Sequence, residues 1–497
     1  MKLSQVMAGA GGKQVSGPSG DPEIRRVTCD SRQVEPGSLF FALAGAKADG
    51  SQFARDAVKK GATVVVAEKA GLSGLRTTSD GLGDAQMIEV SNGRRAMAVA
   101  AANFFGRPAN AMTLLGVTGT NGKTTTTYLV ESILLAAGEK PGVVGTVSYR
   151  FGGQEIPAPN TTPESTALQE LLAQMKKAGT TSVVMEVSSH ALAQERVHGL
   201  SYTSAAFTNL TRDHLDYHHD MESYFAAKRR LFFELLAGPA TINADDAWGV
   251  RLLDELGREG RTAWGFSASG RTADLYVRDC KTSIEGMEGA LVTPRGEAPF
   301  KTRLVGQHNL ENILIAAGLA LGAAFDLKDI VKGIENLANV PGRLERVSGK
   351  GLHVFVDYAH SDDALIRALA ALRPLTTGKL IAVFGCGGDR DKGKRPMMGE
   401  AAGKGSDLAI VTSDNPRTED PQAIIDAILP GLEKSGAKGF RVEPDRRKAI
   451  ELAVALAKPG DVILLAGKGH EDYQIVGTEK HHFDDREEAR RALGVTP

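Results

Sequence analysis

A glycine-rich stretch, Gly116-Val-Thr-Gly-Thr-Asn-Gly-Lys-Thr-Thr125, carries the residue types that bind phosphate groups. Glycines let backbone N–H groups approach phosphate oxygens, Lys123 can neutralise the outer phosphates, and the Thr124 hydroxyl can ligate Mg²⁺. The strict pattern G-x-x-x-x-G-K-[ST] requires glycine where this chain has Val117, so an ordinary glycine-rich turn is the alternative. The stretch predicts a phosphate-binding loop followed by a helix.

A carboxylate, Glu186, lies near the end of the apolar run 182–187. Ligands bind at the carboxyl edge of parallel sheets, so this position suits a metal ion beside Lys123 and Thr124. A carboxylate that caps the following turn is the alternative interpretation. Residues 211–220 add three histidines and three aspartates, which suit Mg²⁺ or substrate handling but lack the spacing of a zinc hydrolase.

A lysine, Lys228, lies in the expected helix 221–236 among apolar residues such as Phe225 and Leu231. Lysine side chains are rarely buried. The residues alone therefore predict that Lys228 is exposed to solvent.

Four polar segments follow expected strands in the last third of the chain. They are Asp357-Tyr-Ala-His360, residues 387–394, Asp414-Asn-Pro-Arg417 and Gly467-Lys-Gly-His-Glu471. The strand ends of an open α/β sheet form its ligand crevice. Because the segments combine carboxylates with guanidinium groups, they predict a pocket for a small molecule that bears both ammonium and carboxylate groups.

The elements that would position these residues alternate between strands and helices. An apolar strand precedes the phosphate-binding loop and a helix over 124–137 follows it, while short strand-like runs occupy 262–305. The last third repeats a strand-helix unit five times, which predicts a doubly wound parallel sheet. Its first glycine-rich turn, Gly385-Cys-Gly-Gly-Asp-Arg390, does not match G-x-G-x-x-G, so a dinucleotide site is disfavoured.

Length and composition indicate a soluble globular protein of several domains. The 497 residues suggest about three domains at roughly 150 residues each. Fifty-nine basic and sixty acidic residues give a net charge of −1, so no whole-chain charge favours nucleic acid or an anionic membrane. The three cysteines are far apart in the sequence and fit neither a disulfide framework nor a zinc pattern, so the protein is expected in a reducing cytoplasm. No run approaches about eighteen apolar residues, so neither export nor a membrane span is expected.

Several motifs resemble those of the Mur ligases, the ATP-dependent amide-forming enzymes of peptidoglycan precursor synthesis. Besides the glycine-rich stretch, they are Met185-Glu-Val-Ser-Ser-His190, Thr211-Arg-Asp-His-Leu-Asp-Tyr-His218, Gly306-Gln-His-Asn-Leu-Glu-Asn312 and Pro341-Gly-Arg343. Four motifs resemble those of the branch of this family that adds the third peptide residue, namely Asp357-Tyr-Ala-His360, Gly385-Cys-Gly-Gly-Asp-Arg390, Asp414-Asn-Pro-Arg417 and Gly467-Lys-Gly-His-Glu471. Asp414-Asn-Pro-Arg417 resembles the form found in ligases that take meso-diaminopimelate rather than lysine. The family's phosphate loop also lacks glycine at the position of Val117.

The resemblance implies an α/β fold with the three-domain Mur ligase architecture. Residues 1–109 would be a small α/β domain that binds the uridine nucleotide. Residues 110–342 would be a central P-loop ATPase-like parallel sheet with extra antiparallel strands. Residues 343–497 would be a Rossmann-like doubly wound sheet that binds the amino acid.

The resemblance also implies which residues bind the substrates. For ATP they are Gly119, Thr120, Asn121, Gly122, Lys123, Thr124, Thr125, Asn309, Asn312 and Arg343. For the uridine nucleotide and its muramoyl dipeptide they are Cys29, Ser31, Ala46, Lys47, Ala48, Asn160, Thr161, Thr162, Ser188, Gln194 and Arg196. For diaminopimelate they are Arg390, Asp414, Asn415, Pro416, Arg417, Gly467 and Glu471.

The implied Mg²⁺ site consists of Thr124, Glu186, His214 and Lys228. In the family the matching lysine is carbamylated to N6-carboxylysine, which turns a cation into an acid-like metal ligand and reverses the exposure expected for Lys228. Lys123, Lys228, His214 and Glu186 are the implied catalytic residues. The roles of His190, His218 and His219 stay open.

The implied reaction is the ATP-dependent addition of meso-diaminopimelate to the D-glutamate γ-carboxylate of UDP-MurNAc-L-Ala-D-Glu, through an acyl phosphate, by a cytoplasmic monomer. Arg390 and Arg417 would recognise the distal carboxylate of diaminopimelate, which lysine lacks. Asp414 and Glu471 would accept its ammonium group. The alternatives are addition of L-lysine or a folylpolyglutamate-type ligation on the same scaffold and, outside the ligases, a binding protein that hydrolyses ATP as a switch.

Overall fold

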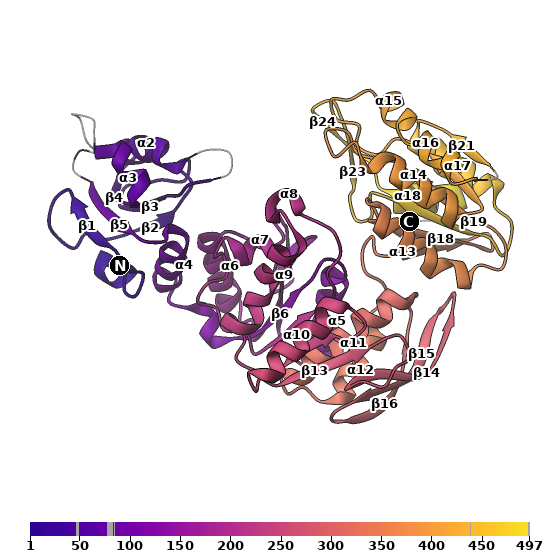
Figure 1. The fold of residues 1–497 in the computed structure, drawn as a ribbon, viewed down its shortest axis with the longest axis horizontal. Coiled ribbons are helices and arrows are strands. Elements are labelled where there is room, and N and C mark those ends of the chain that lie inside the picture. Colours follow the sequence, from indigo (N-terminus) through magenta and orange to yellow (C-terminus); the bar gives the residue numbers. More distant parts are fainter. Residues whose placement is uncertain (46–48, 77–82, 84, 438, 496–497) are drawn as a thin grey trace. The chain divides into compact units, whose positions relative to one another are not determined.

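The computed structural model describes residues 1–45, 49–76, 83, 85–437 and 439–495. The chain forms two compact units. The first comprises Met1–Leu275 and Ile315–Ile330, and the second comprises Tyr276–Leu314 and Val331–Pro497. Both units combine helices with mixed sheets (Figure 1), and most strand pairs are parallel in the first unit and in the six-stranded sheet of the second, so the predicted α/β class is confirmed. The division into three domains after residues 109 and 342 stays a prediction.

The first unit begins with a five-stranded sheet of order β1-β5-β4-β3-β2. Strands β2 to β5 are parallel, and β1 pairs with β5 in the antiparallel sense. The strands are β1 Lys13–Ser16, β2 Arg26–Thr28, β3 Ser38–Ala42, β4 Ala62–Glu68 and β5 Gln86–Val90. The helices are α1 Leu3–Val6, η1 Gly50–Phe53, α2 Ala54–Lys59, α3 Lys69–Arg76 and α4 Gly93–Phe104. Every residue of β3 is buried, as its apolar sequence predicts.

A second sheet in this unit holds strands in the order β13-β12-β11-β6-β10-β7-β8-β9. The first six are parallel, and β8 and β9 continue the sheet as antiparallel strands. The strands are β6 Thr113–Thr118, β7 Pro141–Val144, β8 Ser148–Phe151, β9 Gln154–Pro157, β10 Ser182–Glu186, β11 Ser204–Phe207, β12 Ala240–Asn243 and β13 Ala263–Ser267.

The helices of this part surround the sheet and build its core. They are η2 Pro108–Ala111, α5 Lys123–Ala136, α6 Ser165–Lys177, α7 Ser189–Ala193, α8 Leu215–His218, α9 Met221–Arg230, η3 Leu231–Leu235 and α10 Ala247–Arg258. Apolar residues of α6, α9 and α10 pack with the strands in one large core cluster. Helix α9 passes directly into η3, which is a π-helix. The expected helix 221–236 therefore consists of an α-helix followed by a π-helix.

Two further helices, α11 Gln307–Gly322 and α12 Leu327–Asn336, have residues in both units. In the first unit α11 comes so close to β12 that a Cβ atom on Gly318 would lie 2.4 Å from the Thr241 side chain. Glycine at this position therefore allows the close packing of helix on strand.

The second unit contains a three-stranded antiparallel segment and a six-stranded sheet. The segment consists of β14 Leu275–Ser283, β15 Gly286–Thr293 and β16 Gly296–Thr302. The sheet has the order β17-β18-β22-β19-β20-β21, with only β17 antiparallel to its neighbour. Its strands are β17 Glu345–Gly349, β18 Leu352–Asp357, β19 Leu380–Phe384, β20 Leu408–Val411, β21 Phe440–Val442 and β22 Val462–Ala466. A hairpin of β23 Tyr473–Val476 and β24 Glu479–His482 follows.

Helices cover both faces of the six-stranded sheet, which confirms the predicted doubly wound arrangement. One core cluster contains residues of α13 Asp362–Leu372, α14 Lys394–Gly405, α15 Pro421–Asp426 and α16 Leu429–Lys434. Another contains residues of α17 Arg446–Leu456 and α18 Asp485–Leu493. The short helix η4 Arg373–Leu375 follows α13. Residues 421–434 form two helices, α15 and α16, because Pro430 at the start of α16 has no backbone N–H to continue the first helix.

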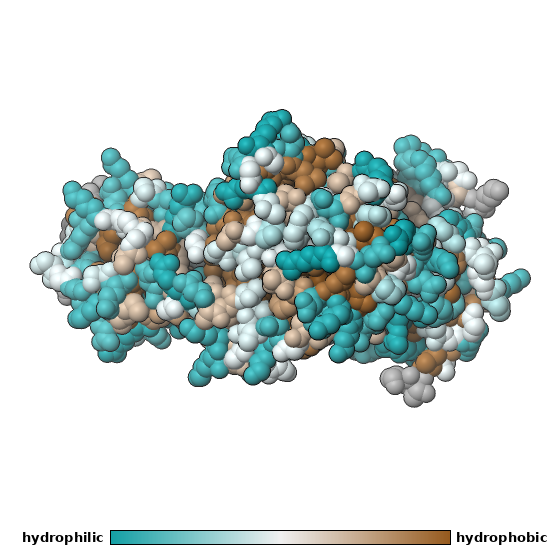
Figure 2. Space-filling model, turned by 90° about the horizontal axis from the view of Figure 1, so that it is seen from below, coloured by the Kyte–Doolittle hydropathy of each residue, from teal (hydrophilic) through white to brown (hydrophobic). Residues whose placement is uncertain are grey.

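The surface is mixed in polarity. Figure 2 shows a face on which hydrophilic residues predominate and hydrophobic residues form smaller areas among them. Within the described ranges, no helix is long and apolar enough to cross a membrane.

Candidate active site

The phosphate-binding loop joins β6 to α5, as predicted. Gly119 and Gly122 have φ angles of +145° and +92°, a region that side chains disfavour. A Cβ atom on Gly119 would lie 1.8 Å from the Thr208 hydroxyl oxygen. Glycine at 119 therefore permits a contact between this loop and the segment that follows β11.

That segment holds the loop in place. The Thr120 N–H donates to the Asn209 carbonyl oxygen over 2.9 Å, and the Asn121 N–H donates to the Asn209 side-chain oxygen over 3.0 Å. The Thr120 hydroxyl also lies 3.3 Å from the Tyr224 hydroxyl of α9. The loop conformation thus depends on elements that are distant in the sequence.

Two lysines converge on one carbonyl group of the loop. Lys123 Nζ donates to the carbonyl oxygens of Gly119 and Thr120 over 3.0 and 2.8 Å. Lys228 Nζ donates to the same Gly119 oxygen over 2.8 Å, and Lys228 is only 1% exposed. The prediction of an exposed Lys228 is wrong. Lys228 lies three residues after Phe225 and four before Phe232, both buried, so helical spacing places it on the same inward face.

The surroundings of Lys228 favour its uncharged form. Burial lowers its pKa well below the ordinary value, the Lys123 ammonium lowers it further, and the Asp213 carboxylate opposes both effects. Its Nζ also lies 4.6 Å from the centroid of the Tyr224 ring. An uncharged amine is a nucleophile, so this lysine is suited to covalent modification.

Glu186 is the last residue of β10 and is fully buried, which confirms its expected place at the carboxyl end of a strand. Its two carboxylate oxygens accept hydrogen bonds from the Thr146 N–H and hydroxyl, each over 2.9 Å. Its role as a metal ligand stays a prediction.

His214 lies directly before α8 and, like Glu186, is predicted to bind a metal ion. Burial lowers the pKa of His214, and the charges of Lys123 and Lys228 lower it further against the effect of Asp213. His214 therefore lies within electrostatic reach of both lysines. Among the described residues, no three His, Cys, Asp or Glu side chains gather closely enough to hold a metal ion. The predicted set of Thr124, Glu186, His214 and carbamylated Lys228 thus stays a prediction.

An aromatic cluster adjoins His214. The ring of His190 lies 4.9 Å from that of His214 and 5.5 Å from that of His218. His218 is buried, and its Nε2 lies 2.9 Å from the Ser189 hydroxyl oxygen. Burial and the neighbouring positive charges lower the pKa of His218 to about 4. These contacts suit a scaffold that holds His214 in position.

The residues predicted to bind the muramoyl dipeptide gather around the end of β10. The Thr162 hydroxyl donates to the Glu186 carbonyl oxygen over 2.8 Å, and the Ser188 N–H donates to the Thr162 hydroxyl over 3.1 Å. Arg196 donates to the Thr162 carbonyl oxygen over 2.8 Å and to the Gln194 side-chain oxygen over 2.8 Å. The structure therefore brings these four residues into one network.

Asn160 and Thr161 lie beside this network. The Thr161 hydroxyl is 3.0 Å from the hydroxyl of Thr146, the residue that binds Glu186. The Asn160 carbonyl oxygen accepts from the Tyr149 hydroxyl over 2.5 Å. Their contact with substrate stays a prediction.

Cys29 faces the same region from the first sheet. Burial raises the pKa of Cys29 to about 11, and the nearby Glu164 carboxylate raises it as well. Glu164 also pairs with Arg94 at 3.5 Å and with Arg196 at 2.8 Å. The same carboxylate therefore acts on Cys29 and binds Arg196 of the dipeptide network. The Ser31 carbonyl oxygen accepts from Lys60 over 2.8 Å. The predicted residues Ala46, Lys47 and Ala48 lie outside the described residues.

Three predicted ATP contacts belong to the second unit. The Asn309 side chain donates to the Val305 carbonyl oxygen over 2.8 Å, and that of Asn312 donates to the Asn309 side-chain oxygen over 3.1 Å. The Arg343 guanidinium lies 5.0 Å from the centroid of the Tyr358 ring. Their role in ATP binding stays a prediction.

The predicted diaminopimelate residues of the second unit lie together at the carboxyl ends of its strands. Arg417 and Arg390 flank Gly387, where a Cβ atom would lie 3.0 Å from Arg417 Nη1 and 3.7 Å from Arg390 Cγ. Arg417 Nη1 donates to the Gly388 carbonyl oxygen over 2.7 Å. The Pro416 carbonyl lies against Gly388. The Arg417 guanidinium and the stem of the Arg390 side chain therefore lie at the same loop.

Acidic groups lie near Arg417, whose charge acts on the Glu471 carboxylate. The Asn415 side chain donates to Glu471 Oε2 over 2.9 Å. A Cβ atom on Gly467 would lie 3.3 Å from Asp414 Oδ2. Burial raises the pKa of Glu471, and the Asp414 carboxylate raises it further. All seven predicted residues are thus gathered by the fold.

Sequence reasoning missed three residues of these sites. Lys468 was part of a recognised polar segment but was not singled out, and it is completely buried with Nζ 3.1 Å from the Asn415 side-chain oxygen. Thr146 binds both oxygens of Glu186, and Tyr224 connects α9 to the phosphate-binding loop. Only Lys468 had a sequence signal, namely its place between Gly467 and Gly469 in that polar segment.

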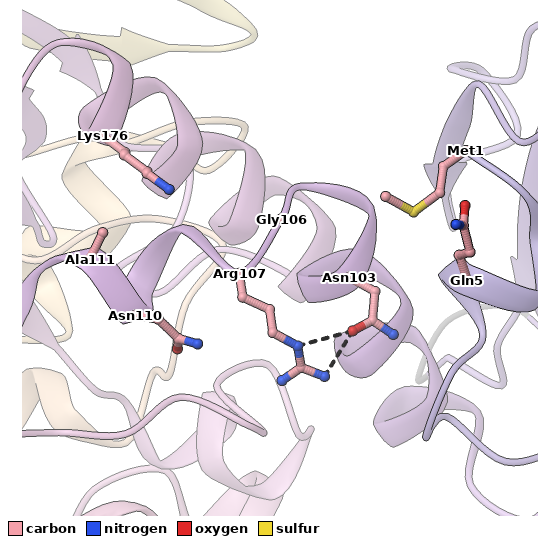
Figure 3. A pocket seen from close by; sticks show the side chains of 8 residues that line it. All are labelled: Met1, Gln5, Asn103, Gly106, Arg107, Asn110, Ala111 and Lys176. Carbon is pink, nitrogen blue, oxygen red and sulfur yellow. Dashed lines mark hydrogen bonds between the residues drawn. The ribbon is translucent and has the colours of Figure 1, made fainter.

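A cavity of about 550 Å³ is lined by a different set of residues (Figure 3). In the close-up, Arg107 Nε and Nη2 donate to the Asn103 side-chain oxygen, over 3.1 and 2.8 Å. The residues that line it are Met1, Gln5, Asn103, Gly106, Arg107, Asn110, Ala111 and Lys176. It contains none of the predicted site residues.

Family models match three segments of the chain. The Mur ligase middle domain matches residues 117–320, the glutamate ligase domain of Mur ligases matches residues 342–469, and the catalytic domain of the Mur ligase family matches residues 23–105. Together with the phosphate-binding loop and the two gathered sites, these matches define the class: the chain belongs to the Mur ligase family.

Individual relatives identify the branch of the family that the chain resembles. A UDP-N-acetylmuramoyl-L-alanyl-D-glutamate–2,6-diaminopimelate ligase of Geobacter metallireducens is 51% identical, over 95% of this chain and 94% of the relative. The enzyme of the same name from Gloeobacter violaceus is 49% identical, over 99% and 98%. A solved structure that carries this enzyme name covers 99% of both chains with a TM-score of 0.72 and 34% identity. The predicted resemblance is confirmed.

Proposed function

We propose that this chain is an ATP-dependent ligase that joins meso-diaminopimelate to the D-glutamate γ-carboxylate of UDP-N-acetylmuramoyl-L-alanyl-D-glutamate, a step of peptidoglycan precursor synthesis. The names of its relatives support this substrate pair. The observation that carries the proposal is that Arg390, Arg417 and the acidic group Glu471 lie in one loop cluster. Such a cluster supplies donors for a carboxylate and acceptors for an ammonium group.

This cluster also provides a basis for choosing between diaminopimelate and lysine. The distal carboxylate of diaminopimelate would bind the guanidinium groups of Arg390 and Arg417, while its ammonium group would bind Asp414 and Glu471. Lysine has no distal carboxylate, so it would leave these donors without that partner. An unmade charge-assisted hydrogen bond of this kind is worth a few kcal/mol, in the range of about 1 to 3.

Carboxylate activation would take place at the phosphate-binding loop. Lys123 would exchange its present carbonyl partners for the outer phosphates of ATP, supported by the N–H groups of residues 119–125 and by Asn309, Asn312 and Arg343. The D-glutamate γ-carboxylate attacks the γ-phosphorus and ADP leaves, which gives an acyl phosphate. The diaminopimelate amine then attacks the acyl carbon, loses a proton, and releases phosphate.

The donors near the loop fit Mg²⁺ if Lys228 is carbamylated. Thr124, Glu186, His214 and the carbamate would hold the ion, and it would supply charge neutralisation for the phosphates. An ammonium group cannot ligate a cation, whereas a carbamate offers oxygen ligands. The burial and lowered pKa of Lys228 support the modification, because only an uncharged amine reacts with CO₂.

Each of the three segments of the chain would have its own role in the reaction. Residues 1–109 would bind the uridine part through Cys29, Ser31 and residues 46–48, and the network of Asn160, Thr161, Thr162, Ser188, Gln194 and Arg196 would hold the dipeptide. Residues 110–342 would activate it, and residues 343–497 would deliver the amine. Because ATP and uridine nucleotides are cytoplasmic metabolites, we assign the reaction to the cytoplasm, carried out by a monomer.

An assay of phosphate release with ATP, the uridine-nucleotide dipeptide and one amino acid at a time tests the proposal. The expected result is turnover with meso-diaminopimelate and little with L-lysine. Turnover with lysine alone would identify a lysine-adding ligase, and turnover with a folate substrate a folylpolyglutamate-type ligase. ATP hydrolysis that needs no amine acceptor would favour a nucleotide switch.

A further inference from the structure

Lys468 is an ammonium group enclosed within the second unit. It is 0% exposed and comes two residues after the end of β22. Its Nζ donates to the Asn415 side-chain oxygen over 3.1 Å and to the Tyr473 carbonyl oxygen over 2.6 Å, and it lies 3.5 Å from Asp414 Oδ1. A buried charge is costly unless it is paired, and these three oxygens provide the pairing.

Lys468 and the Ile475 N–H together determine which way the Asn415 amide points. The Asn415 oxygen accepts from Lys468 Nζ and, over 3.0 Å, from the Ile475 N–H, and both partners can only donate. The amide nitrogen must therefore face the opposite side, where it donates to Glu471 Oε2 over 2.9 Å. A reversed amide would present its nitrogen to two donors, so the observed orientation follows from Lys468 together with the Ile475 N–H.

The same ammonium balances two neighbouring carboxylates. Burial and Asp414 raise the pKa of Glu471, whereas the Asn415 hydrogen bond and Lys468 lower it. Asp414 is 7% exposed, and within the described part of the chain its Oδ1 has no hydrogen-bond donor, although Lys468 lies at ion-pair distance. A buried acceptor of this kind is suited to a donor on a ligand.

We propose that Lys468 is a positioning residue for the amino-acid substrate, acting through Asn415 and Glu471 without contacting the substrate itself. It aligns the carboxylates of Glu471 and Asp414 so that they receive the substrate's ammonium group, an inference that rests on the proposed function. The ammonium group is common to diaminopimelate and lysine, so the role does not depend on which of them is the natural acceptor.

The chain offers a matched control in Arg446, another buried cation of this unit. Arg446 is 1% exposed and binds both carboxylate oxygens of Asp485, over 2.8 and 2.6 Å, and the Ala466 carbonyl oxygen over 3.0 Å. Its hydrogen bonds therefore support the end of β22 and α18 rather than the Asn415 amide. Loss of the Arg446 charge should destabilise the fold, as loss of the Lys468 charge does. It should not change the orientation of the Glu471 carboxylate.

The test compares full-length Lys468→Met and Arg446→Met with the wild-type chain. ATP, the uridine-nucleotide dipeptide and meso-diaminopimelate are varied in turn. Lys468→Met should raise KM for diaminopimelate about tenfold or more and leave the other two KM values within about twofold, because a misdirected hydrogen-bond network weakens only one substrate. Equal changes in all three KM values, or the same selective rise in Arg446→Met, would overturn the role of Lys468.

Binding without turnover provides a second measurement. Millimolar meso-diaminopimelate should raise the Tm of the wild type and lose this effect in Lys468→Met, while ATP stabilises both equally. If the wild type shows the diaminopimelate shift but forms no product, the proposed function fails, and the shift in Lys468→Met still decides the role of Lys468. If Lys468→Met does not fold, Asn415→Leu must show the same selective KM rise, and an unchanged KM there contradicts the proposal.

Discussion

The side-chain nitrogen of Lys228 lies 2.8 Å from the carbonyl oxygen of Gly119, inside the phosphate-binding loop. Lys123 binds the same oxygen over 3.0 Å, so two amino groups share one acceptor. Burial and mutual repulsion favour the uncharged form of Lys228. If Lys228 is converted to a carbamate, its nitrogen keeps one N–H and gains a carboxylate group beside the loop, so its contact with Gly119 has to adjust. The chemical state of a helix residue is thereby linked to the conformation of the loop.

Replacement of Lys228 by alanine should lower kcat about a hundredfold or more, the usual cost of removing one stabilising group from such a site. Phosphate release in bicarbonate buffer measures the loss. Lys176→Ala, at an exposed position, is the control and should retain full activity. ¹³C NMR of protein equilibrated with labelled bicarbonate should show a carbamate carbon that Lys228→Ala lacks. Wild-type activity of Lys228→Ala would refute the carbamate role.

Replacement of Arg417 by lysine should lower kcat/KM for diaminopimelate about tenfold to a hundredfold, because an ammonium group cannot form the bidentate pair that a guanidinium forms with a carboxylate. The low rate with L-lysine should change little, since lysine has no distal carboxylate. Arg441→Lys, on the exposed part of β21, is the matched control. An equal loss with both amino acids would show that Arg417 supports the loop instead.

Alanine at position 119 should weaken ATP binding about tenfold or more, because its Cβ would lie 1.8 Å from the Thr208 hydroxyl oxygen and its φ is +145°. Titration with a fluorescent ATP analogue measures the effect. Gly257→Ala is the control, since among the described residues no atom beyond its own helix backbone lies within 4 Å of a Cβ there, and it should leave binding intact. Unchanged affinity of Gly119→Ala would mean that the loop rearranges freely.

The three cysteines should react with iodoacetamide in a fixed order at pH 8. Thiolates are the reactive form, and burial raises the pKa of Cys29 to about 11 and that of Cys386 to about 12. Cys280 is exposed, so it should be labelled first, as peptide mass spectrometry can follow. The uridine-nucleotide substrate should slow the labelling of Cys29 further. Labelling of Cys29 as fast as Cys280 would contradict the observed burial.

His218 should make the fold sensitive to mild acid. Its pKa is lowered to about 4 in the folded protein, whereas an unfolded histidine titrates near 6.5. Between these values only the unfolded chain binds the proton, so the free energy of unfolding falls as pH drops from 6.5 to 4, by up to about 3 kcal/mol, and then levels off. The Tm of His218→Asn should depend less on pH in this window. Parallel curves for the two proteins would exclude the effect.

Local sequence patterns were sufficient to predict the phosphate-binding loop and the position of Glu186 at the end of a strand. Glycines next to a Gly-Lys-Thr sequence specify a strand-loop-helix unit through their own backbone preferences, and an acid that ends an apolar run is placed by the strand itself. The five strand-helix repeats likewise follow from hydrophobic runs of the right length. These features depend on neighbours within a few residues.

Lys228 could not be placed by residue type, because its partner Gly119 is 109 residues away in the sequence. The spacing of Phe225, Lys228 and Phe232 did indicate a common face, but the general exposure of lysine outweighed it. Lys468 was missed for a similar reason, since its contacts with Asn415 and Tyr473 exist only after the sheet has formed. The edge strand β17, the hairpin of β23 and β24 and the helix α18 also lacked a strong local pattern.

The π-helical turn Leu231–Leu235 begins three residues after Lys228, the lysine that binds the Gly119 carbonyl oxygen of the phosphate-binding loop. A π-helical turn contains about one residue more than an α-helical turn, and here it ends the helix, because Leu236 is already extended. Insertion of a single residue between Lys228 and the buried Phe232 would turn one of the two side chains by about 100° around the helix axis and off the inward face. A sequence could thus retain every residue of the site and lose the site, through a change in length alone.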